Sequence, residues 1–310
     1  MKIITLTLNP AFDIHCCADG FKPYSESIVS IISRDAGGKG VNISRALSGV
    51  ETLNTAVVVL GEENGEEFYK LLLDDGMSVK PIYSNGRIRE NITLHEKTNP
   101  ETRISFGGFS VGNDIISEVK NAIGEVDENT IITFTGSIPP GMEIKDVLKM
   151  LLEYKALGAK VVIDSRSVTL EDVMDFKPWL IKPNKDEAEK YVQKNISMPE
   201  DAIKIAAEIH KSGVENVMIS LGGDGAVLVS DEGCYYAKTP KIHAVSTIGA
   251  GDSTIAGFID GFSKGYKMDE CLCHASAFGT AACMRDGTKP PLSEDIQKIK
   301  KEIKIFKIPV

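Results

Sequence analysis

The residues best suited to chemistry lie in one late stretch, residues 245–258, where three small residues precede an aspartate. Gly249, Ala250 and Gly251 form a turn, and apolar residues at helical spacing follow them, so we expect a helix to start near Asp252. The start of a helix has unpaired backbone N–H groups and a partial positive charge, and glycine lets a ligand approach that backbone closely. The stretch therefore predicts an anion site for a phosphoryl group in transfer, with Asp252 placed to accept a proton from the attacking hydroxyl. The alternative is an ordinary capping aspartate after a glycine turn.

Two other glycine-containing segments could bind parts of a substrate. Residues 37–40, Gly-Gly-Lys-Gly, open a predicted helix at 41–47, and Lys39 in that turn suits an anionic or hydroxylated ligand. Residues 136–141, Gly-Ser-Ile-Pro-Pro-Gly, follow a predicted strand at 130–134 and so lie at a sheet edge, where ligand sites form. Each segment also has a plain interpretation, as a glycine-rich helix start and as a rigid connecting loop.

Two further segments indicate where a nucleotide would lie. Lys182 follows a predicted strand, and Asn184 and Glu187 are three residues apart at a predicted helix start, so they share a face. That pair could orient water around a magnesium ion carried by phosphates, or it could form a capping box. Residues 222–225, Gly-Gly-Asp-Gly, fit either a nucleotide lying against glycine backbone or a hairpin turn.

Short apolar strands alternate with helices along most of the chain, and such continuous apolar strands indicate a sheet covered on both faces. We expect an α/β fold with a mostly parallel central sheet between helix layers, and ligands at the carboxyl ends of its strands. The predicted strands span 2–8, 54–60, 79–83, 130–134, 160–163, 179–181, 216–221, 226–229 and 234–238. The predicted helices span 41–47, 63–73, 114–123, 143–157, 184–193, 199–211, 253–264, 268–284 and 293–303.

A small antiparallel sheet is expected to stand apart from this core as a lid, formed from about residues 12–35 and 87–109. Its predicted strands are 28–33, 91–95 and 102–106, with a turn around Asn99 and Pro100. Arg89 and Arg103 in this segment would supply forked donors for a substrate phosphate. Because such a sheet is too small to have its own core, we expect it to pair with the lid of a second subunit in a homodimer.

Composition limits the possible partners and location. The 310 residues are 42% hydrophobic and 25% charged, which is typical of a globular protein, and we expect one domain over residues 1–310. The net charge of −9 argues against nucleic acid or an anionic membrane surface as a partner. The first ten residues are typical of a strand rather than a signal peptide, and no run of 18 apolar residues occurs. The six cysteines follow no disulfide framework, so we expect a cytoplasmic protein.

The joint order of these motifs resembles the phosphofructokinase B sugar kinases, a ribokinase-like family, from Leu8 to about Thr288. Two signatures carry the resemblance: residues 37–46, GGKGVNISRA, and residues 246–253, STIGAGDS. The segments NPAFD at 9–13, GSIPPG at 136–141 and KPNKDE at 182–187 are similar to the branch that acts on hexose phosphates, namely 1-phosphofructokinase and tagatose-6-phosphate kinase.

The resemblance implies a role for each matching residue, with ATP and Mg²⁺ as cofactors. Asp252 would be the catalytic base, and Gly249, Ala250 and Gly251 would form the anion hole for the γ-phosphoryl group. The substrate would be bound by Asp13, Gly38, Lys39, Asn42, Arg89, Arg103 and Ser137. The nucleotide would be bound by Lys182, Asn184, Ser220, Gly222, Gly225, Thr247, Gly249 and Gly251. Glu187, acting through water, and Asn184 would face the magnesium ion.

The implied activity is ATP-dependent phosphorylation of a ketohexose monophosphate, with fructose 1-phosphate preferred as the acceptor. Tagatose 6-phosphate and, less readily, fructose 6-phosphate are alternative acceptors, since a pocket that recognises both ends of the molecule serves each of them. A free-sugar or nucleoside kinase of the same fold is a second enzyme interpretation. The non-enzyme alternative is a sugar-phosphate sensor that has kept the pocket.

Overall fold

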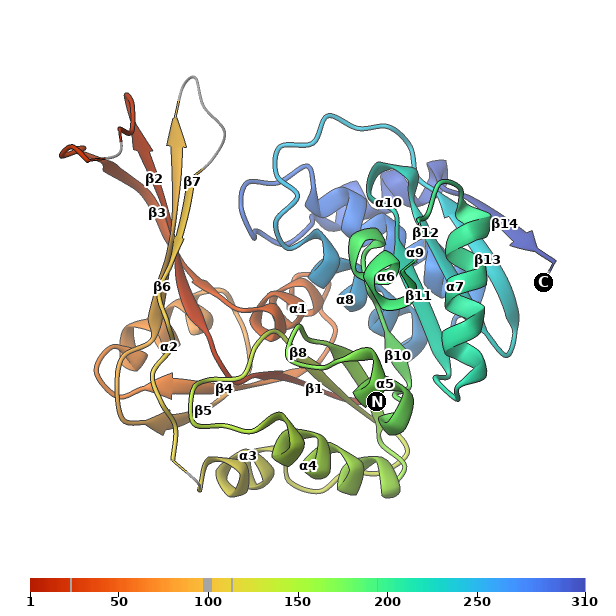
Figure 1. Ribbon diagram of the computed structural model, residues 1–310, viewed down its shortest axis with the longest axis horizontal. Helices are drawn as coiled ribbons and strands as arrows, with labels where there is room; N and C mark the ends of the chain where they lie inside the picture. Colours follow the sequence, from red (N-terminus) through yellow and green to blue (C-terminus); the bar gives the residue numbers. More distant parts are fainter. Residues whose placement is uncertain (23, 97–101, 113, 194, 310) are drawn as a thin grey trace.

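The centre of the computed structural model is a mixed ten-stranded sheet, formed within the described residues 1–22, 24–96, 102–112, 114–193 and 195–309 (Figure 1). In spatial order its strands are β14 (Lys304–Ile308), β13 (Gly233–Lys238), β12 (Ala226–Ser230), β11 (Asn216–Ser220), β10 (Leu180–Ile181), β9 (Lys160–Asp164), β8 (Thr130–Thr135), β1 (Lys2–Thr7), β4 (Thr55–Gly61) and β5 (Val79–Ser84). The strands from β11 to β5 pair in parallel, and β12, β13 and β14 extend the sheet in antiparallel pairs. The predicted mostly parallel sheet is therefore confirmed.

Helices cover both faces of this sheet and bury two apolar layers. The helices are α1 (Lys39–Ser48), α2 (Gly65–Asp74), α3 (Ile115–Ile123), α4 (Ile144–Ala156), α5 (Leu170–Phe176), α6 (Lys185–Val192), α7 (Pro199–Lys211), α8 (Ala250–Ser263), α9 (Met268–Ala282) and α10 (Ser293–Glu302). Leu47, Phe258 and Leu272, from α1, α8 and α9, belong to one fully buried cluster. Val119 and Leu151, from α3 and α4, belong to the cluster on the other face. Burial on both faces explains why the central strands are continuously apolar.

The parallel arrangement gathers the strand ends that matter for function at one edge. Parallel strands all end on the same side, and the segments that follow β8, β9 and β10 begin at Gly136, Ser165 and Lys182. The Asn184 backbone continues the sheet by one parallel bridge to Ser220, the last residue of β11. The edge therefore carries the segments at 136–141 and 182–187 that the sequence singles out, and the segment at 222–225 follows β11.

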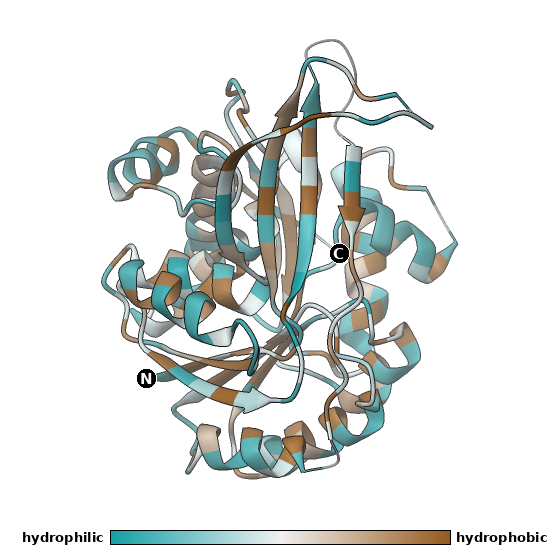
Figure 2. Ribbon diagram, turned by 90° about the vertical axis from the view of Figure 1, so that its left-hand side faces the viewer, coloured by the Kyte–Doolittle hydropathy of each residue, from teal (hydrophilic) through white to brown (hydrophobic). Residues whose placement is uncertain are grey.

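The lid is a separate four-stranded sheet in the order β3 (Ser30–Gly37), β2 (Ala11–Ala18), β6 (Arg89–Glu96) and β7 (Thr102–Ser105). It rises beside the main sheet in Figure 1, and Figure 2 shows hydrophobic and hydrophilic positions alternating along its strands. The β2–β3 and β6–β7 pairs are antiparallel, whereas β2 and β6 run parallel. The small separate sheet that the sequence predicts is confirmed.

One polar side chain of the lid reaches the segment that follows α9. Asp13 and His15 alternate along β2 with the buried residues Phe12, Ile14 and Cys16. The Nε2 atom of His15 lies 3.5 Å from the position that a Cβ atom would take on Gly287, in the segment after α9. The polar residues of β2 are therefore on the side of the strand that approaches this segment.

Three elements differ from the sequence expectations. Residues 11–18 form the central lid strand β2 rather than a segment leaving β1. Partly exposed polar residues alternate with buried apolar residues along it, which is the pattern of a strand with one buried face. The short helix α5 and the edge strand β14 were not predicted. The predicted turn at Asn99 and Pro100 lies outside the described residues. None of the described helices is both long and apolar enough to cross a bilayer.

Candidate active site

The amino terminus of α8 is an uncapped helix start lined by small residues. Gly249 adopts the left-handed conformation at the N-cap position, with φ 76°, and no side chain caps the helix. Ala250 and Gly251 form the first helical residues, so their backbone N–H groups belong to the first turn, which has no intrahelical acceptors. The predicted anion hole is thus present as a backbone feature, and its role toward a phosphoryl group stays a prediction.

Asp252 lies buried in the first turn of α8, with 6% of its surface exposed. The Asn42 side-chain amide, in α1, donates a 2.8 Å hydrogen bond to Asp252 Oδ2. Burial raises the pKa of the Asp252 carboxyl to about 6, although the Lys39 ammonium and the Asn42 amide both favour its ionised form. A carboxylate with a pKa just below neutrality is ionised at pH 7 and is still basic enough to accept a proton from an alcohol in the transition state.

The orientation of Asn42 is itself fixed by a buried arginine. Arg45 donates from Nη1 to Asn42 Oδ1 at 3.2 Å, and its Nε forms a 2.7 Å ion pair with Asp75. Because the amide oxygen of Asn42 accepts from Arg45, its nitrogen is the atom that faces Asp252. The carboxylate of Asp252 is therefore held by a polar chain that begins at the surface.

Lys39 and Asp164 form an ion pair at the edge of the sheet, next to Asp252. The distance from Lys39 Nζ to Asp164 Oδ2 is 3.0 Å. Burial alone would raise the pKa of Asp164, but the Lys182 and Lys39 ammonium groups outweigh it and hold that pKa below its ordinary value. Burial would likewise lower the pKa of Lys39, yet Asp164 and Asp252 raise it. Both groups therefore carry their charges at neutral pH.

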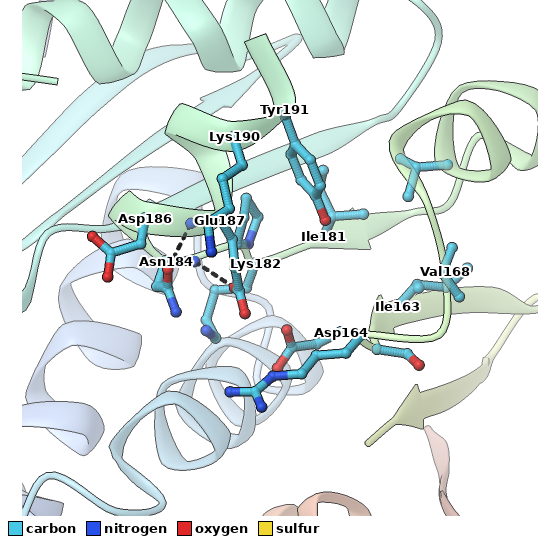
Figure 3. A pocket seen from close by; sticks show the side chains of 14 residues that line it. Ile163, Asp164, Val168, Ile181, Lys182, Asn184, Asp186, Glu187, Lys190 and Tyr191 are labelled. Carbon is cyan, nitrogen blue, oxygen red and sulfur yellow. Dashed lines mark hydrogen bonds between the residues drawn. The ribbon is translucent and has the colours of Figure 1, made fainter. Parts of the chain in front are cut away.

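A cavity of about 510 Å³ at the ends of β9 and β10 brings together charged side chains from separate strands (Figure 3). Asp164, Lys182, Asn184 and Glu187 all line it. Asn184 Oδ1 accepts from the Glu187 backbone N–H at 2.9 Å, and Glu187 Oε2 accepts from the Asn184 N–H at 3.0 Å, so the capping box is present. The predicted contact of these two residues with magnesium stays a prediction beside that structural role.

The carboxylate oxygen atoms of this cavity suit a magnesium ion whose other ligands are water and phosphate oxygen atoms. Within the described ranges, no group of three or more His, Cys, Asp or Glu side chains is placed to hold a metal ion by itself. Magnesium commonly keeps several waters and binds through one or two carboxylates and substrate phosphates. Asp164 and Glu187 supply carboxylates of that kind, so the residues present fit the ion.

A second cavity, of about 750 Å³, lies beside the first and shares Asn184 with it. Its walls include the glycine turn between β11 and β12, where Gly222 and Gly225 have positive φ angles, and the start of α8. Of the predicted nucleotide residues it is lined by Asn184, Ser220, Gly222, Gly225, Thr247 and Gly251, and Ala250 of the predicted anion hole also lines it. Gly249 does not line it. Lys182 approaches from the other cavity, where its Nζ lies 3.1 Å from the position of a Cβ atom on Gly251.

The lid supplies a polar cluster at its base. Asn91 donates from Nδ2 to Asp13 Oδ1 at 2.9 Å, and a Cβ atom on Gly37 would lie only 2.0 Å from Asp13 Oδ2. Burial raises the pKa of Asp13 and lowers that of Arg89, and each group opposes the shift of the other. Gly38, with φ 136°, opens α1 beneath this cluster. Asp13, Arg89 and the start of α1 are therefore gathered near Asn42, as the sequence predicts.

Arg103 is not brought next to Arg89. It pairs across the sheet with Thr93, four residues along β6 from Arg89, which corresponds to about 13 Å of strand. Ser137, after β8, is instead linked to the Arg89 end through Asn9. Asp164 was missing from the sequence expectations, and Asn9, which opens the quoted segment NPAFD, was given no role in the site. Asp164 had one usable signal, its position at the carboxyl end of a buried strand.

This arrangement defines a ribokinase-like phosphotransferase, and comparison with known proteins agrees. The pfkB family carbohydrate kinase model matches residues 7–295. A 1-phosphofructokinase of Vibrio cholerae is 29% identical over 305 residues, covering 98% of this chain and 96% of the relative. The ATP-dependent 6-phosphofructokinase isozyme 2 of Escherichia coli is 28% identical over 302 residues, covering 96% and 98%.

Solved structures extend the same comparison. Phosphofructokinase-2 of Escherichia coli in complex with substrates and products superimposes with a TM-score of 0.90 at 27% identity, covering 97% of this chain and 99% of that one. Another structure of that enzyme is described as its tetrameric inhibited form. The chain belongs to the pfkB family of carbohydrate kinases. It is an ATP-dependent sugar-phosphate kinase, which transfers a phosphoryl group to an alcohol.

Proposed function

We propose that the protein transfers the γ-phosphoryl group of ATP to the free primary hydroxyl of a ketohexose monophosphate, and that fructose 1-phosphate is its preferred acceptor. The observation that supports the reaction most strongly is the buried carboxylate of Asp252 in the first turn of α8, held by Asn42. The preference for fructose 1-phosphate is supported by the names of relatives that are 29% identical over nearly the whole chain.

In the proposed reaction Asp252 accepts the proton of the acceptor hydroxyl as its oxygen attacks the γ-phosphorus. The backbone N–H groups of Gly249, Ala250 and Gly251 stabilise the charge on the transferred group. Lys182, with its ammonium beside Gly251, neutralises phosphate oxygens from the opposite side. Little covalent chemistry is required of the protein, because alignment and charge neutralisation provide most of the catalysis of phosphoryl transfer.

Magnesium, bound through the nucleotide phosphates, would neutralise charge on the β- and γ-phosphoryl oxygens. Asp164 and Glu187 would hold it, directly or through water, from the cavity that they share. The Lys182 and Lys39 ammonium groups keep Asp164 ionised, and the 3.0 Å ion pair with Lys39 also orients it.

The base of the lid is proposed to recognise the sugar phosphate. Arg89 Nε is buried without a hydrogen-bond partner among the described residues, as is Asn91 Oδ1. A buried donor and a buried acceptor without partners are costly unless a ligand satisfies them. A phosphate bound by Arg89 and sugar hydroxyls bound by Asp13 and Asn91 would supply the missing hydrogen-bond partners. Gly38 and Asn42 would bind the part of the sugar that lies toward Asp252.

The substrate assignment is tested by measuring steady-state ADP release with ATP and each of four acceptors: fructose 1-phosphate, tagatose 6-phosphate, fructose 6-phosphate and free ribose. The proposal predicts the highest kcat/KM for fructose 1-phosphate and at least tenfold less for ribose. A tagatose 6-phosphate or fructose 6-phosphate optimum would reassign the acceptor within the class. A ribose optimum would contradict the whole proposal.

Two arginine variants sharpen this test. Arg89→Ala should raise KM for the sugar phosphate by about 10- to 100-fold, because charge-assisted bonds to a phosphate are worth roughly 1.5–3 kcal/mol. Arg103→Ala should raise the same KM less, because Arg103 pairs with Thr93, four residues along β6 from Arg89. Neither variant should change KM for ATP.

The protein is further proposed to act as a homodimer through its lid and to work in the cytoplasm. The lid face opposite Asp13 carries Ile31 and Ile104, whose exposed fractions are 67% and 42%. Ile31 pairs with Cys16 on β2, and Ile104 pairs with Ile92 on β6, so both belong to the apolar face of the lid. Burial of such a face against a second copy would remove it from water. The six cysteines are free, as is usual in a reducing compartment.

A further inference from the structure

Asn9 joins the lid to the main sheet at the place where the substrate phosphate is proposed to bind. It lies in the short connection between β1 and β2. Its side-chain Nδ2 donates to Ser137 Oγ at 3.1 Å and to the Ile138 carbonyl at 3.2 Å. Its backbone carbonyl accepts from Arg89 Nη2 at 3.4 Å. One residue therefore contacts both groups that the phosphate would need.

The direction of the Asn9 amide is set by its surroundings. The Ile138 carbonyl can only accept a hydrogen bond, so the amide nitrogen must face it. The amide oxygen then points the other way, where it is buried without a hydrogen-bond partner among the described residues. A Cβ atom on Gly108 would lie 2.4 Å from that oxygen, so glycine at this position leaves room for the amide.

This direction has a consequence for the Ser137 hydroxyl. Because Ser137 Oγ accepts a hydrogen bond from Asn9, one of its lone pairs is occupied and its proton is directed elsewhere. Among the hydrogen bonds of the described residues, Ser137 Oγ takes part only as this acceptor and donates to no other group. A hydroxyl held in this way is a ready donor to an anion. Arg89, the first residue of β6, supplies a second unpaired donor, its Nε, and its Nη2 contacts the Asn9 carbonyl.

We propose that Asn9 is a positioning residue that makes the enzyme selective for phosphorylated acceptors. Its side chain orients the Ser137 hydroxyl as a donor, while its backbone carbonyl accepts from Arg89 Nη2, so that both donors meet a single phosphate group. The inference rests on the proposed function, since it assigns the specificity of that site. It predicts that Asn9 acts on KM for the sugar phosphate rather than on phosphoryl transfer itself.

The test is a double-mutant cycle of Asn9→Ala and Ser137→Ala, with kcat and KM measured for fructose 1-phosphate and for ATP. Each single variant should raise KM for fructose 1-phosphate by about tenfold, as expected when one hydrogen bond to a charged group is lost. The double variant should raise KM little further, because the two residues act through one bond. KM for ATP should be unchanged and kcat should stay within about threefold of wild type. With free fructose as acceptor, kcat/KM should not change.

Asn216→Ala is the control for loss of an asparagine whose amide donates to a backbone carbonyl. Its side chain donates to the Trp179 carbonyl at 2.9 Å, far along the sheet from the lid. This variant should lose stability without any change in KM for fructose 1-phosphate. A KM increase that accompanied destabilisation in both asparagine variants would show that Asn9 is only structural.

Two gentler variants keep the test decisive if Asn9→Ala does not fold. Gly108→Ala keeps Asn9 but places a methyl group against its amide oxygen, so the amide must move away from Ser137. This variant should reproduce the increase in KM for fructose 1-phosphate. Asn9→Asp keeps the shape but sets a carboxylate against the Ile138 carbonyl and the substrate phosphate, and it should raise KM more than alanine does. Unchanged KM in Gly108→Ala and Asn9→Asp, or additive effects in the cycle, would overturn the inference.

Failure of this inference can be distinguished from failure of the proposed function. If wild-type protein phosphorylates no sugar phosphate, the proposed function is wrong and the Asn9 assignment falls with it. If wild-type protein does so while the Asn9 and Gly108 variants keep the wild-type KM, only the Asn9 assignment is wrong.

Discussion

The side-chain amide of Asn42 donates a 2.8 Å hydrogen bond to the carboxylate of Asp252, which is 210 residues further along the chain. The bond joins the first turn of α1 to the first turn of α8. Helix α1 follows lid strand β3, and the start of α8 lines the cavity of about 750 Å³. The bond therefore ties α1, which is proposed to contribute to sugar binding, to the start of α8, which is proposed to bind the phosphoryl group. It does so at the carboxylate proposed to accept the proton.

The pH dependence of activity should report the Asp252 carboxyl. Its pKa is raised to about 6 by burial, so the ionised base is lost as pH falls through that value. We expect kcat/KM for the sugar phosphate to fall tenfold per pH unit below about pH 6 and to level off above it. A rate profile in a three-component buffer at constant ionic strength measures this. The phosphate of the sugar also titrates near this pH, so the profile should be repeated with a free ketohexose. If kcat/KM for the free ketohexose falls only near pH 4, the assignment to Asp252 is contradicted.

Removal of the Asn42 amide should shift that profile. The amide stabilises the ionised carboxylate, so Asn42→Ala should raise the pKa of Asp252 further, by about one unit for the loss of one hydrogen bond to a charged group. The acid limb of kcat/KM should move upward by the same amount, with a lower rate at pH 7. Asn216→Ala should leave the profile unchanged. An unmoved acid limb in Asn42→Ala would show that another group controls the rate.

A methyl group on Gly251 should disturb the phosphoryl site and little else. A Cβ atom there would lie 3.1 Å from Lys182 Nζ, so the ammonium would have to move away from the helix start. We expect Gly251→Ala to lower kcat by about 10- to 100-fold while KM for the sugar phosphate changes by less than threefold. Gly112→Ala, which places the same methyl group in open space, is the control. Wild-type kcat in Gly251→Ala would remove Lys182 from the proposed mechanism.

The lid should hold two subunits together through its apolar face. Ile104→Lys introduces a charge at a 42% exposed lid position and should convert a dimer into a monomer. Leu53→Lys, at an 87% exposed position outside the lid, should leave the dimer intact. Light scattering at micromolar concentration measures both. A wild-type protein that is monomeric under these conditions would contradict the proposed assembly.

Most of the main sheet could be predicted from sequence because its strands are short, apolar and separated by helices. β8 and β9 illustrate this, since each is a buried run with a clear boundary. β2 was missed because the polar residues Asp13 and His15 interrupt the run, although the buried positions alternate between them. α5 was missed because it has only seven residues, and its capping box from Thr169 to Asp172 was its one clear local signal.

The candidate site was predictable where a residue type and its backbone signal occur together, as for Asp252 after its glycine turn. Asp164 and Asn9 could not be singled out, because each depends on contacts made across the sheet. Asp164 meets Lys39 across 125 residues, and Asn9 meets Ser137 across 128. Only the order of the strands brings these pairs together. Arg103 lies beside Thr93, four residues along β6 from Arg89, so its predicted contact with the same phosphate stays a prediction.

Turnover of Asp252→Asn is the most direct measurement of the central claim. With saturating ATP and fructose 1-phosphate, ADP release should fall by about 10³-fold or more, while calorimetry shows both ligands still bound. The raised pKa means that the ionised carboxylate destabilises the fold above pH 6, so the variant should unfold no more easily than wild type at pH 8. A folded Asp252→Asn protein that turns over within tenfold of the wild-type rate would contradict the proposal that this carboxylate is the base.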